Sequence, residues 1–155
     1  MILVAVIVLL GMSSASGVIL LDTSDPAVNT TAPAGNLAGS GWQFEGIWGG
    51  YLGTPIAPHF FITAAHIGQA DVNFRFQGST YTIAGSFSQP GSDLLIWRVN
   101  ETFSSFAPLY SKRDEISRHL VVIGRGTLRG GAVTLNGTLR GWLWGSGDGQ
   151  ARWGE

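Results

Sequence analysis

Hydrophobic and polar residues alternate in short stretches along most of this chain. In residues 72–77, hydrophobic side chains occupy positions 72, 74 and 76, and polar side chains occupy the positions between them. A period of two is typical of a β-strand with one buried face. Gly78-Ser79 then supplies a turn and residues 80–84 a second segment, so the pattern predicts a β-hairpin.

Further short apolar segments are bounded by glycine, proline or polar turn residues and are predicted to be strands: 42–48, 51–57, 59–64, 94–99 and 119–123, the last ended by Gly124-Arg125-Gly126. Asn136-Gly137 lies between apolar flanks and is the strongest hairpin signal in the chain. Residues 100–117 are polar and irregular and are predicted to be a linker. No helix of ordinary length is required, so we expect an all-β protein built as a sandwich or barrel.

The N-terminus has the character of an export signal. Residues 2–10 form a continuous apolar run, and Ser14-Ala15-Ser16 offers small residues for cleavage, although no lysine or arginine precedes the run. We expect residues 1–16 to be a signal peptide and the mature protein to be secreted, periplasmic or extracellular. The alternative is a buried N-terminal strand. Residues 17–41 are predicted to be an extended leader.

Composition excludes several kinds of site. Of the 155 residues, 45% are hydrophobic and 12% charged, and the net charge of −1 gives no reason to expect nucleic acid or an anionic membrane as a partner. The absence of cysteine excludes thiol nucleophiles, cysteine–zinc sites and iron–sulfur clusters, and the three histidines show no metal-ligand spacing. We expect no cofactor, no metal and, after signal cleavage, no membrane. The oligomeric state is left open.

The candidate chemistry centres on His66, which ends the apolar segment Phe60-Phe61-Ile62-Thr63-Ala64-Ala65. Histidine is the commonest general base because its ordinary pKa is near neutrality. Asp93 directly precedes the apolar segment 94–99, so a strand would hold its carboxylate where it could orient the imidazole. Two plainer interpretations stay open, a histidine without a function and a carboxylate that only begins a strand. Asp71 is the alternative acid, and its position favours a turn cap.

Several motifs resemble those of trypsin/chymotrypsin-like serine proteases. Thr63-Ala64-Ala65-His66 is similar to the histidine motif of that family, and Asp93-Leu94-Leu95-Ile96 is similar to its aspartate motif. Gly53-Thr54-Pro55-Ile56-Ala57-Pro58 and Val121-Val122-Ile123-Gly124-Arg125-Gly126 resemble the strands that precede the histidine and open the second barrel. The resemblance implies two antiparallel six-stranded barrels with the active site between them. It also implies that His66 is the general base and that Asp93 orients it.

The nucleophile that this resemblance requires is missing. The family has a serine in Gly-Asp-Ser-Gly-Gly, whereas Gly145-Ser146-Gly147-Asp148-Gly149 contains the same residue types in another order. We therefore expect the catalytic serine to lie beyond Glu155 rather than at Ser146. The expected fold is a chymotrypsin-like double antiparallel β-barrel, with the first barrel and its linker at 42–117 and the start of an incomplete second barrel at 118–155.

The leading hypothesis is the N-terminal part of an exported trypsin-like serine endopeptidase, acting on polypeptides and without turnover on its own. The alternative is a non-catalytic protease-like β-barrel used for binding or surface attachment. A third hypothesis, an unrelated glycine-rich β domain, predicts that His66 and Asp93 lie far apart. The triad hypothesis predicts an Nδ1-to-carboxylate distance of about 2.6–3.2 Å.

Overall fold

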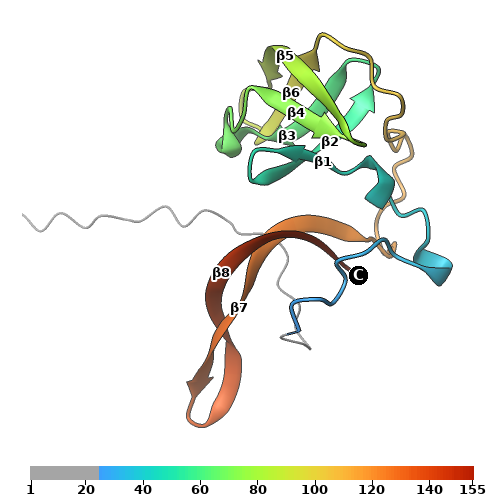
Figure 1. Ribbon diagram of the computed structural model, residues 1–155. Coiled ribbons are helices and arrows are strands. Elements are labelled where there is room, and N and C mark those ends of the chain that lie inside the picture. Colours follow the sequence, from blue (N-terminus) through green and yellow to red (C-terminus); the bar gives the residue numbers. More distant parts are fainter. Residues whose placement is uncertain (1–24) are drawn as a thin grey trace, which may run out of the picture.

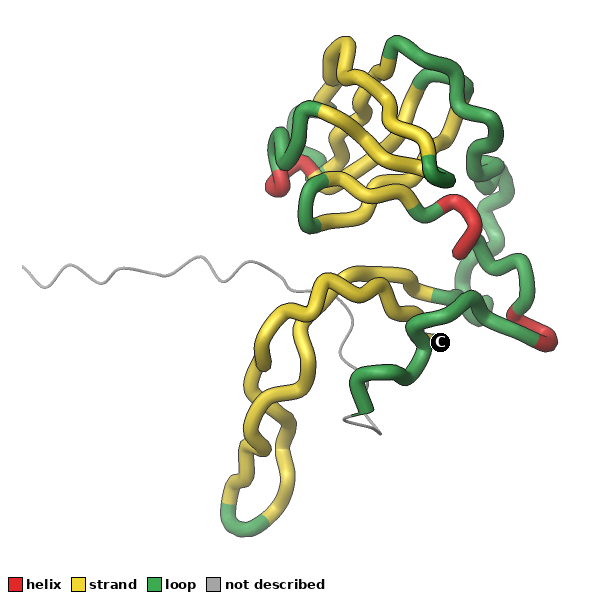
Figure 2. Tube along the Cα trace, in the orientation of Figure 1, coloured by secondary structure: helices red, strands yellow, loops and turns green. Residues whose placement is uncertain are grey.

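The computed structural model describes residues 25–155, and this part of the chain is all-β, as the sequence predicts (Figures 1 and 2). The predicted signal peptide and the first residues of the predicted leader lie outside the described residues. Within residues 25–155, the helices are three short 3₁₀ turns, η1 (Gly35–Leu37), η2 (Trp42–Phe44) and η3 (Ala65–Ile67).

Six antiparallel strands close into a barrel in the order β1-β2-β3-β6-β5-β4, and β4 pairs with β1 to complete it. The strands are β1 (Gly46–Trp48), β2 (Tyr51–Ala57), β3 (Phe60–Ala64), β4 (Asn73–Phe76), β5 (Ser79–Ser88) and β6 (Leu94–Val99). The predicted hairpin is β4 and β5. The predicted strand 42–48 is divided into η2 and β1. Because β1 and β4 pair with each other, each barrel strand has a hydrogen-bonded neighbour on both sides and the sheet has no edge strand.

The interior of the barrel is aromatic. Phe61 on β3 and Phe74 on β4 stack with ring centroids 4.0 Å apart, and both side chains are fully buried. Gly46 and Gly53 are paired across β1 and β2 beside these rings. A Cβ at Gly46 would lie 2.0 Å from Phe74 Cζ, and a Cβ at Gly53 would lie 2.9 Å from both rings. The paired glycines therefore let the backbone of β1 and β2 lie directly on the stacked rings.

A buried side-chain hydrogen bond also ties β3 to β6. Trp97 Nε1 donates to Thr63 Oγ1 at 3.0 Å, and both side chains are buried. The Trp97 ring packs against Trp48, with ring centroids 4.9 Å apart. Since a buried polar group without a partner is costly, this bond makes the two positions depend on each other. It holds the end of β3 directly before the segment that contains His66.

The second sheet is a long hairpin of β7 (Val122–Leu135) and β8 (Thr138–Gly154). Its turn is Asn136-Gly137, as predicted. The φ values of 51° at Asn136 and 75° at Gly137 are those of a type I′ turn, whose twist matches that of a hairpin.

The prediction that Gly124-Arg125-Gly126 ends a strand over 119–123 was wrong. β7 begins at Val122 and continues through these glycines. The register of β7 against β8 shifts between Arg125 and Thr127, which marks a β-bulge. A bulge bends a strand without ending it, so β7 continues beyond the two glycines. Residues 100–121, between β6 and β7, contain no regular element.

The hairpin projects away from the barrel (Figure 1). Large apolar side chains on its outer part are exposed: Val133, Leu135, Leu139, Leu143 and Trp144. A two-stranded hairpin is marginally stable by itself in water, and these side chains contribute little stability while they remain exposed. The second sheet is therefore partial, in contrast to the closed barrel.

A half-buried acid lies beside the second sheet. Glu45 directly precedes β1, and its Oε1 is buried without a hydrogen-bond partner. Burial raises the pKa of Glu45 to about 7, and the charge of Arg125 on β7 partly opposes this shift. Burial removes water that would solvate the carboxylate, and the protein supplies no hydrogen bond to its Oε1 in place of that water, so the neutral form is favoured.

Gly46→Ala is expected to destabilise the barrel by about 1–3 kcal/mol, because the added Cβ would overlap the Phe74 ring. Gly85→Ala is the matched control, since Gly85 is also a strand glycine and a Cβ there meets nothing within 4 Å. The control is expected to be neutral or to stabilise by about 0.5 kcal/mol. Urea unfolding followed by tryptophan fluorescence measures both, and equal effects would contradict the close approach.

Stability is expected to fall as the pH rises from about 4.5 through about 7, because the folded state raises the pKa of Glu45 and binds its proton more tightly than the unfolded chain. Partial exposure of the side chain limits the loss to about 1–2 kcal/mol. Glu45→Gln should remove this dependence, and Glu115→Gln, at an exposed position, should retain it. Urea unfolding at a series of pH values makes the comparison. A parallel pH dependence in wild type and Glu45→Gln would refute this role of Glu45.

Candidate functional site

Strand register brings His66 and Asp93 together. β3 pairs antiparallel with β6, and Ala64 at the end of β3 lies opposite Leu94 at the start of β6. His66 follows β3 within η3 and Asp93 immediately precedes β6, so both lie at the same rim of the barrel. The backbone N–H of Ala65 donates to the Asp93 carbonyl at 2.9 Å and continues the ladder beyond the paired strands.

The Asp93 carboxylate holds His66 at two points. Its Oδ2 lies 2.6 Å from His66 Nδ1, and its Oδ1 accepts the backbone N–H of His66 at 2.8 Å. One carboxylate therefore contacts both the ring and the main chain of the same residue, which restricts rotation of the imidazole. The short distance contradicts the wide separation that the hypothesis of an unrelated β domain predicts.

This contact gives the two ring nitrogens different roles. An ionised carboxylate only accepts hydrogen bonds, so Nδ1 carries the proton that faces Asp93, and Nε2 of the neutral ring carries the lone pair. The hydrogen bond from the His66 side chain is the main cause that holds the pKa of Asp93 below its ordinary value, and the His66 backbone N–H adds to it. Asp93 is therefore ionised at neutral pH and can stabilise a protonated imidazole.

The pair is open to solvent. The side chains of His66 and Asp93 are 54% and 59% exposed. His66 Nε2 makes no hydrogen bond to any residue in the range 25–155. An imidazole in this state can accept a proton from a hydroxyl group that approaches within about 2.6–3.2 Å. The arrangement therefore suits general-base chemistry on a group that reaches the barrel rim from outside.

Ser146 does not belong to this pair. It is an exposed residue of β8, on the projecting hairpin. In the part of the chain that the structure describes, no serine or threonine hydroxyl hydrogen bonds to His66. The fold thus brings together the two residues singled out as base and acid, and brings no hydroxyl to them.

The remaining candidates have structural contacts. His59 Nδ1 lies 2.9 Å from the carbonyl oxygen of Glu101, and its Nε2 lies 3.4 Å from Thr102 Oγ1, so both ring nitrogens are engaged. Asp71 Oδ1 accepts the next two backbone N–H groups at 2.7 and 3.3 Å. The predicted turn-capping role of Asp71 is confirmed.

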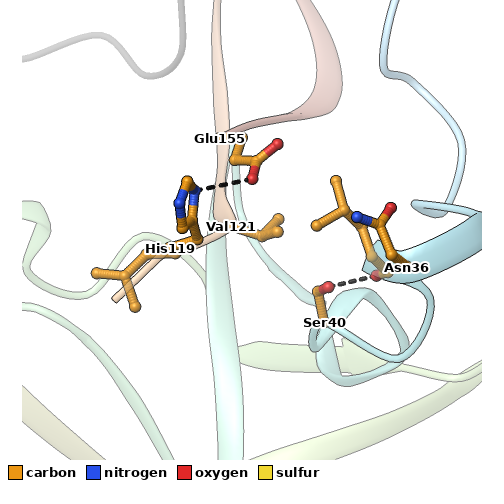
Figure 3. A pocket seen from close by; sticks show the side chains of 7 residues that line it. Asn36, Ser40, His119, Val121 and Glu155 are labelled. Carbon is orange, nitrogen blue, oxygen red and sulfur yellow. Dashed lines mark hydrogen bonds and ion pairs between the residues drawn. The ribbon is translucent and has the colours of Figure 1, made fainter. Parts of the chain in front are cut away.

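A cavity of about 680 Å³ lies between the leader and the base of the hairpin. Ser40, His119 and Glu155 line it and together have the residue types of a triad (Figure 3). However, the Ser40 hydroxyl donates to the Leu37 carbonyl, while His119 Nδ1 lies 3.1 Å from Glu155 Oε1. Figure 3 shows these two interactions on different sides of the cavity, so the three residues are not arranged as a second triad.

Residues 25–155 contain neither a cluster of metal-ligating side chains nor a helix that could cross a membrane. No three histidine, aspartate or glutamate side chains of this part are grouped as metal ligands would be. None of its helices has the length and apolar character needed to cross a membrane. The candidate site consists of the two side chains at the barrel rim.

Sequence reasoning missed the second contact of Asp93, in which Oδ1 accepts the His66 backbone N–H. This contact depends on the register in which β3 pairs with β6. A shift of one residue would turn the Asp93 side chain to the other face of the sheet, so the register would have to be known to predict the contact. It also missed the burial of Glu45, whose only signal is a carboxylate placed directly before a buried strand.

His66→Ala is expected to raise the pKa of Asp93 toward its ordinary value, because the hydrogen bond from the ring is the main cause of the lowering. A lowered carboxyl pKa stabilises the folded state above about pH 4, and this contribution is lost as the pH falls through the folded pKa. The stability difference between wild type and Asp93→Asn should therefore shrink in acid. NMR titration of carboxyl carbons measures the pKa, with His119→Ala as control because His119 pairs with Glu155. An unchanged Asp93 pKa in His66→Ala would count against the contact.

Comparison of the chain with known proteins gives no match. No family model fits it, and no curated protein or solved structure is significantly similar to it. The resemblance to trypsin-like proteases therefore depends on the quoted motifs alone, with the geometry of His66 and Asp93 as the structural observation beside them.

Proposed function

We propose that this chain is the N-terminal part of an exported trypsin-like serine endopeptidase, in which His66 and Asp93 are the base and the orienting acid of a Ser-His-Asp triad. The observation that carries the proposal is the 2.6 Å contact between His66 Nδ1 and Asp93 Oδ2. The closed barrel supports it, because β3 and β6 deliver both residues to one rim.

In the proposed reaction, His66 Nε2 takes the proton of a serine hydroxyl as the serine oxygen attacks the carbonyl carbon of a polypeptide substrate. The protonated imidazole then gives this proton to the leaving amine, and the peptide bond breaks to form an acyl-enzyme. Water hydrolyses the ester with His66 again acting as base. Asp93 keeps the ring in one tautomer, and its contact with the His66 main chain preserves the ring orientation through both steps.

The serine and the oxyanion hole are proposed to come from protein outside this sequence, in a chymotrypsin-like second barrel. The β7–β8 hairpin would contribute the first strands of that barrel. Its exposed apolar side chains support this part of the proposal, because further strands packed on them would remove them from water.

The same apolar side chains also favour the alternative, a non-catalytic protease-like barrel used for binding or surface attachment. A group of exposed apolar residues often marks a surface for another protein. In that case the His66–Asp93 pair would be present without a nucleophile.

A fluorophosphonate probe tests the proposal, because it labels a serine that a neighbouring base activates. Residues 1–155 are expected to stay unlabelled, since no hydroxyl in the described range contacts His66. A protein that includes the reading frame after Glu155 is expected to be labelled at one serine. In that longer protein, His66→Ala should abolish labelling, and Asp93→Asn should slow it by about 10⁴-fold.

His59→Ala is the matched control in the longer protein, because both nitrogens of that ring are engaged elsewhere. It should be labelled at the wild-type rate. Stoichiometric labelling of Ser146 in the 155-residue chain would overturn the assignment of the nucleophile. A longer protein that completes the second sheet but contains no labelled serine would favour the binding function.

A further inference from the structure

The predicted leader contacts the end of β8. Residues 25–31 form a turn, in which the backbone N–H of Ala27 donates to Asp25 Oδ1 at 2.9 Å and Thr30 Oγ1 donates to the Ala27 carbonyl at 2.8 Å. The turn lies beside the last residues of β8, from which more than 120 positions of sequence separate it (Figure 1). A contact over this sequence distance is a tertiary interaction of the leader, not local structure.

Three donors of β8 meet three backbone carbonyls of the leader. Arg152 Nη2 donates to the Pro26 carbonyl at 2.7 Å. The backbone N–H of Trp153 donates to the Asn29 carbonyl at 3.3 Å, and Trp153 Nε1 donates to the Thr31 carbonyl at 2.8 Å. Two adjacent residues of β8 thus bind the carbonyls of Pro26, Asn29 and Thr31.

Asn29 completes this contact with its side chain. Asn29 Nδ2 donates to the Trp153 carbonyl at 2.8 Å, so one residue binds both backbone groups of Trp153, as a neighbouring strand would. The φ of Asn29 is 56°, in the left-handed region that asparagine adopts more readily than most residues. Both the side-chain amide and the backbone conformation therefore favour asparagine at this position.

Burial shows why the contact matters to the hairpin. Arg152 is only 4% exposed, and a buried guanidinium is costly unless hydrogen bonds satisfy it. The Pro26 carbonyl supplies one of its partners. The leader also covers backbone groups at a strand edge, which are otherwise open to pairing with another segment.

The turn is connected to the hairpin rather than to the barrel. Within the described chain, residues 26–31 hydrogen bond to one another, to Asp25 and to β8, and to none of the strands β1–β6. Beyond the turn, Asn36 and Ser40 of the leader line the cavity that His119 and Glu155 line from the hairpin side (Figure 3). The turn itself does not line this cavity, and its hydrogen bonds to the rest of the described chain go to β8.

We propose that Arg152 and Trp153 form a docking site for a peptide turn, that residues 25–31 occupy it in cis, and that this clasp opens without unfolding of the barrel. The partner that the site fits is a turn presenting three backbone carbonyls and one asparagine side chain. The clasp does not depend on the proposed protease function, because within the described residues none of its members hydrogen bonds or forms an ion pair with His66 or Asp93.

Asn29→Asp in the full chain tests the clasp. Aspartate retains the shape and the left-handed preference of asparagine but replaces the Nδ2 donor by an oxygen that faces the Trp153 carbonyl. NMR hydrogen exchange at the backbone N–H and Nε1–H of Trp153 is expected to be at least about fivefold faster, the factor that corresponds to one lost hydrogen bond. The amides of Phe61 and Trp97 in the barrel are expected to exchange at the wild-type rate.

Asn29→Ala provides a second variant without the added carboxylate, and it should accelerate exchange at Trp153 in the same way. Asn36→Ala is the matched control, since Asn36 belongs to the same leader and is exposed. It should leave the exchange at Trp153 unchanged. Unchanged exchange in both Asn29 variants, or equal acceleration at Phe61 and Trp153, would overturn the proposal of a separable clasp.

A synthetic peptide with the sequence of residues 25–31 tests the docking site in trans. At millimolar concentration, about the effective concentration of a segment on a short flexible tether, it should slow exchange at Trp153 in the Asn29→Ala chain. The same peptide with alanine in place of asparagine should not. Equal effects of the two peptides, or no slowing by either, would overturn the proposal of a docking site.

Discussion

The stacked pair of Phe61 and Phe74 is the contact on which the barrel depends. The two rings lie directly on the backbone of β1 and β2, because the paired residues Gly46 and Gly53 have no side chains there. A small barrel holds few side chains in its interior, so the place of one ring constrains its neighbours. Phe61 belongs to β3, and β3 leads the chain to His66. Packing of Phe61 in the core therefore fixes the path of β3, and with it the position of the His66 imidazole five residues later.

Two acids of this protein show opposite responses to their surroundings. Asp93 is exposed but accepts hydrogen bonds from the His66 ring and main chain, and these lower its pKa. Glu45 is half-buried with an unsatisfied oxygen, and loss of solvation raises its pKa to about 7. Hydrogen bonding is the dominant influence on the first acid and burial on the second. A carboxylate at an open rim can thus be more firmly ionised than one close to a charged arginine.

Local patterns predicted where the barrel strands lie but not all of their bounds, since only Gly46–Trp48 of the predicted strand 42–48 is a strand and β5 extends beyond the predicted 80–84 to Ser88. The alternation over 72–77 and the Asn136-Gly137 turn specify their elements through neighbouring residues alone, and both predictions are confirmed. The contact between His66 and Asp93 could be anticipated because each residue adjoins a recognisable strand. The course of β7 through Gly124-Arg125-Gly126 depends on a bulge against β8, which no local pattern reveals. The contacts of Asn29 with Trp153 join residues 124 positions apart in the sequence, and only the folded structure brings them together.

Closure of the barrel has a consequence for the order in which this protein folds. All six of its strands lie between Gly46 and Val99, so every strand pairing of the barrel can form without any residue of β7 or β8. The leader precedes the barrel in the sequence, yet its docking partner Trp153 follows the barrel. The leader therefore cannot be anchored until the last residues of β8 have been synthesised. Docking of the leader therefore follows synthesis of the whole hairpin, whereas the strand pairing of the barrel does not require it.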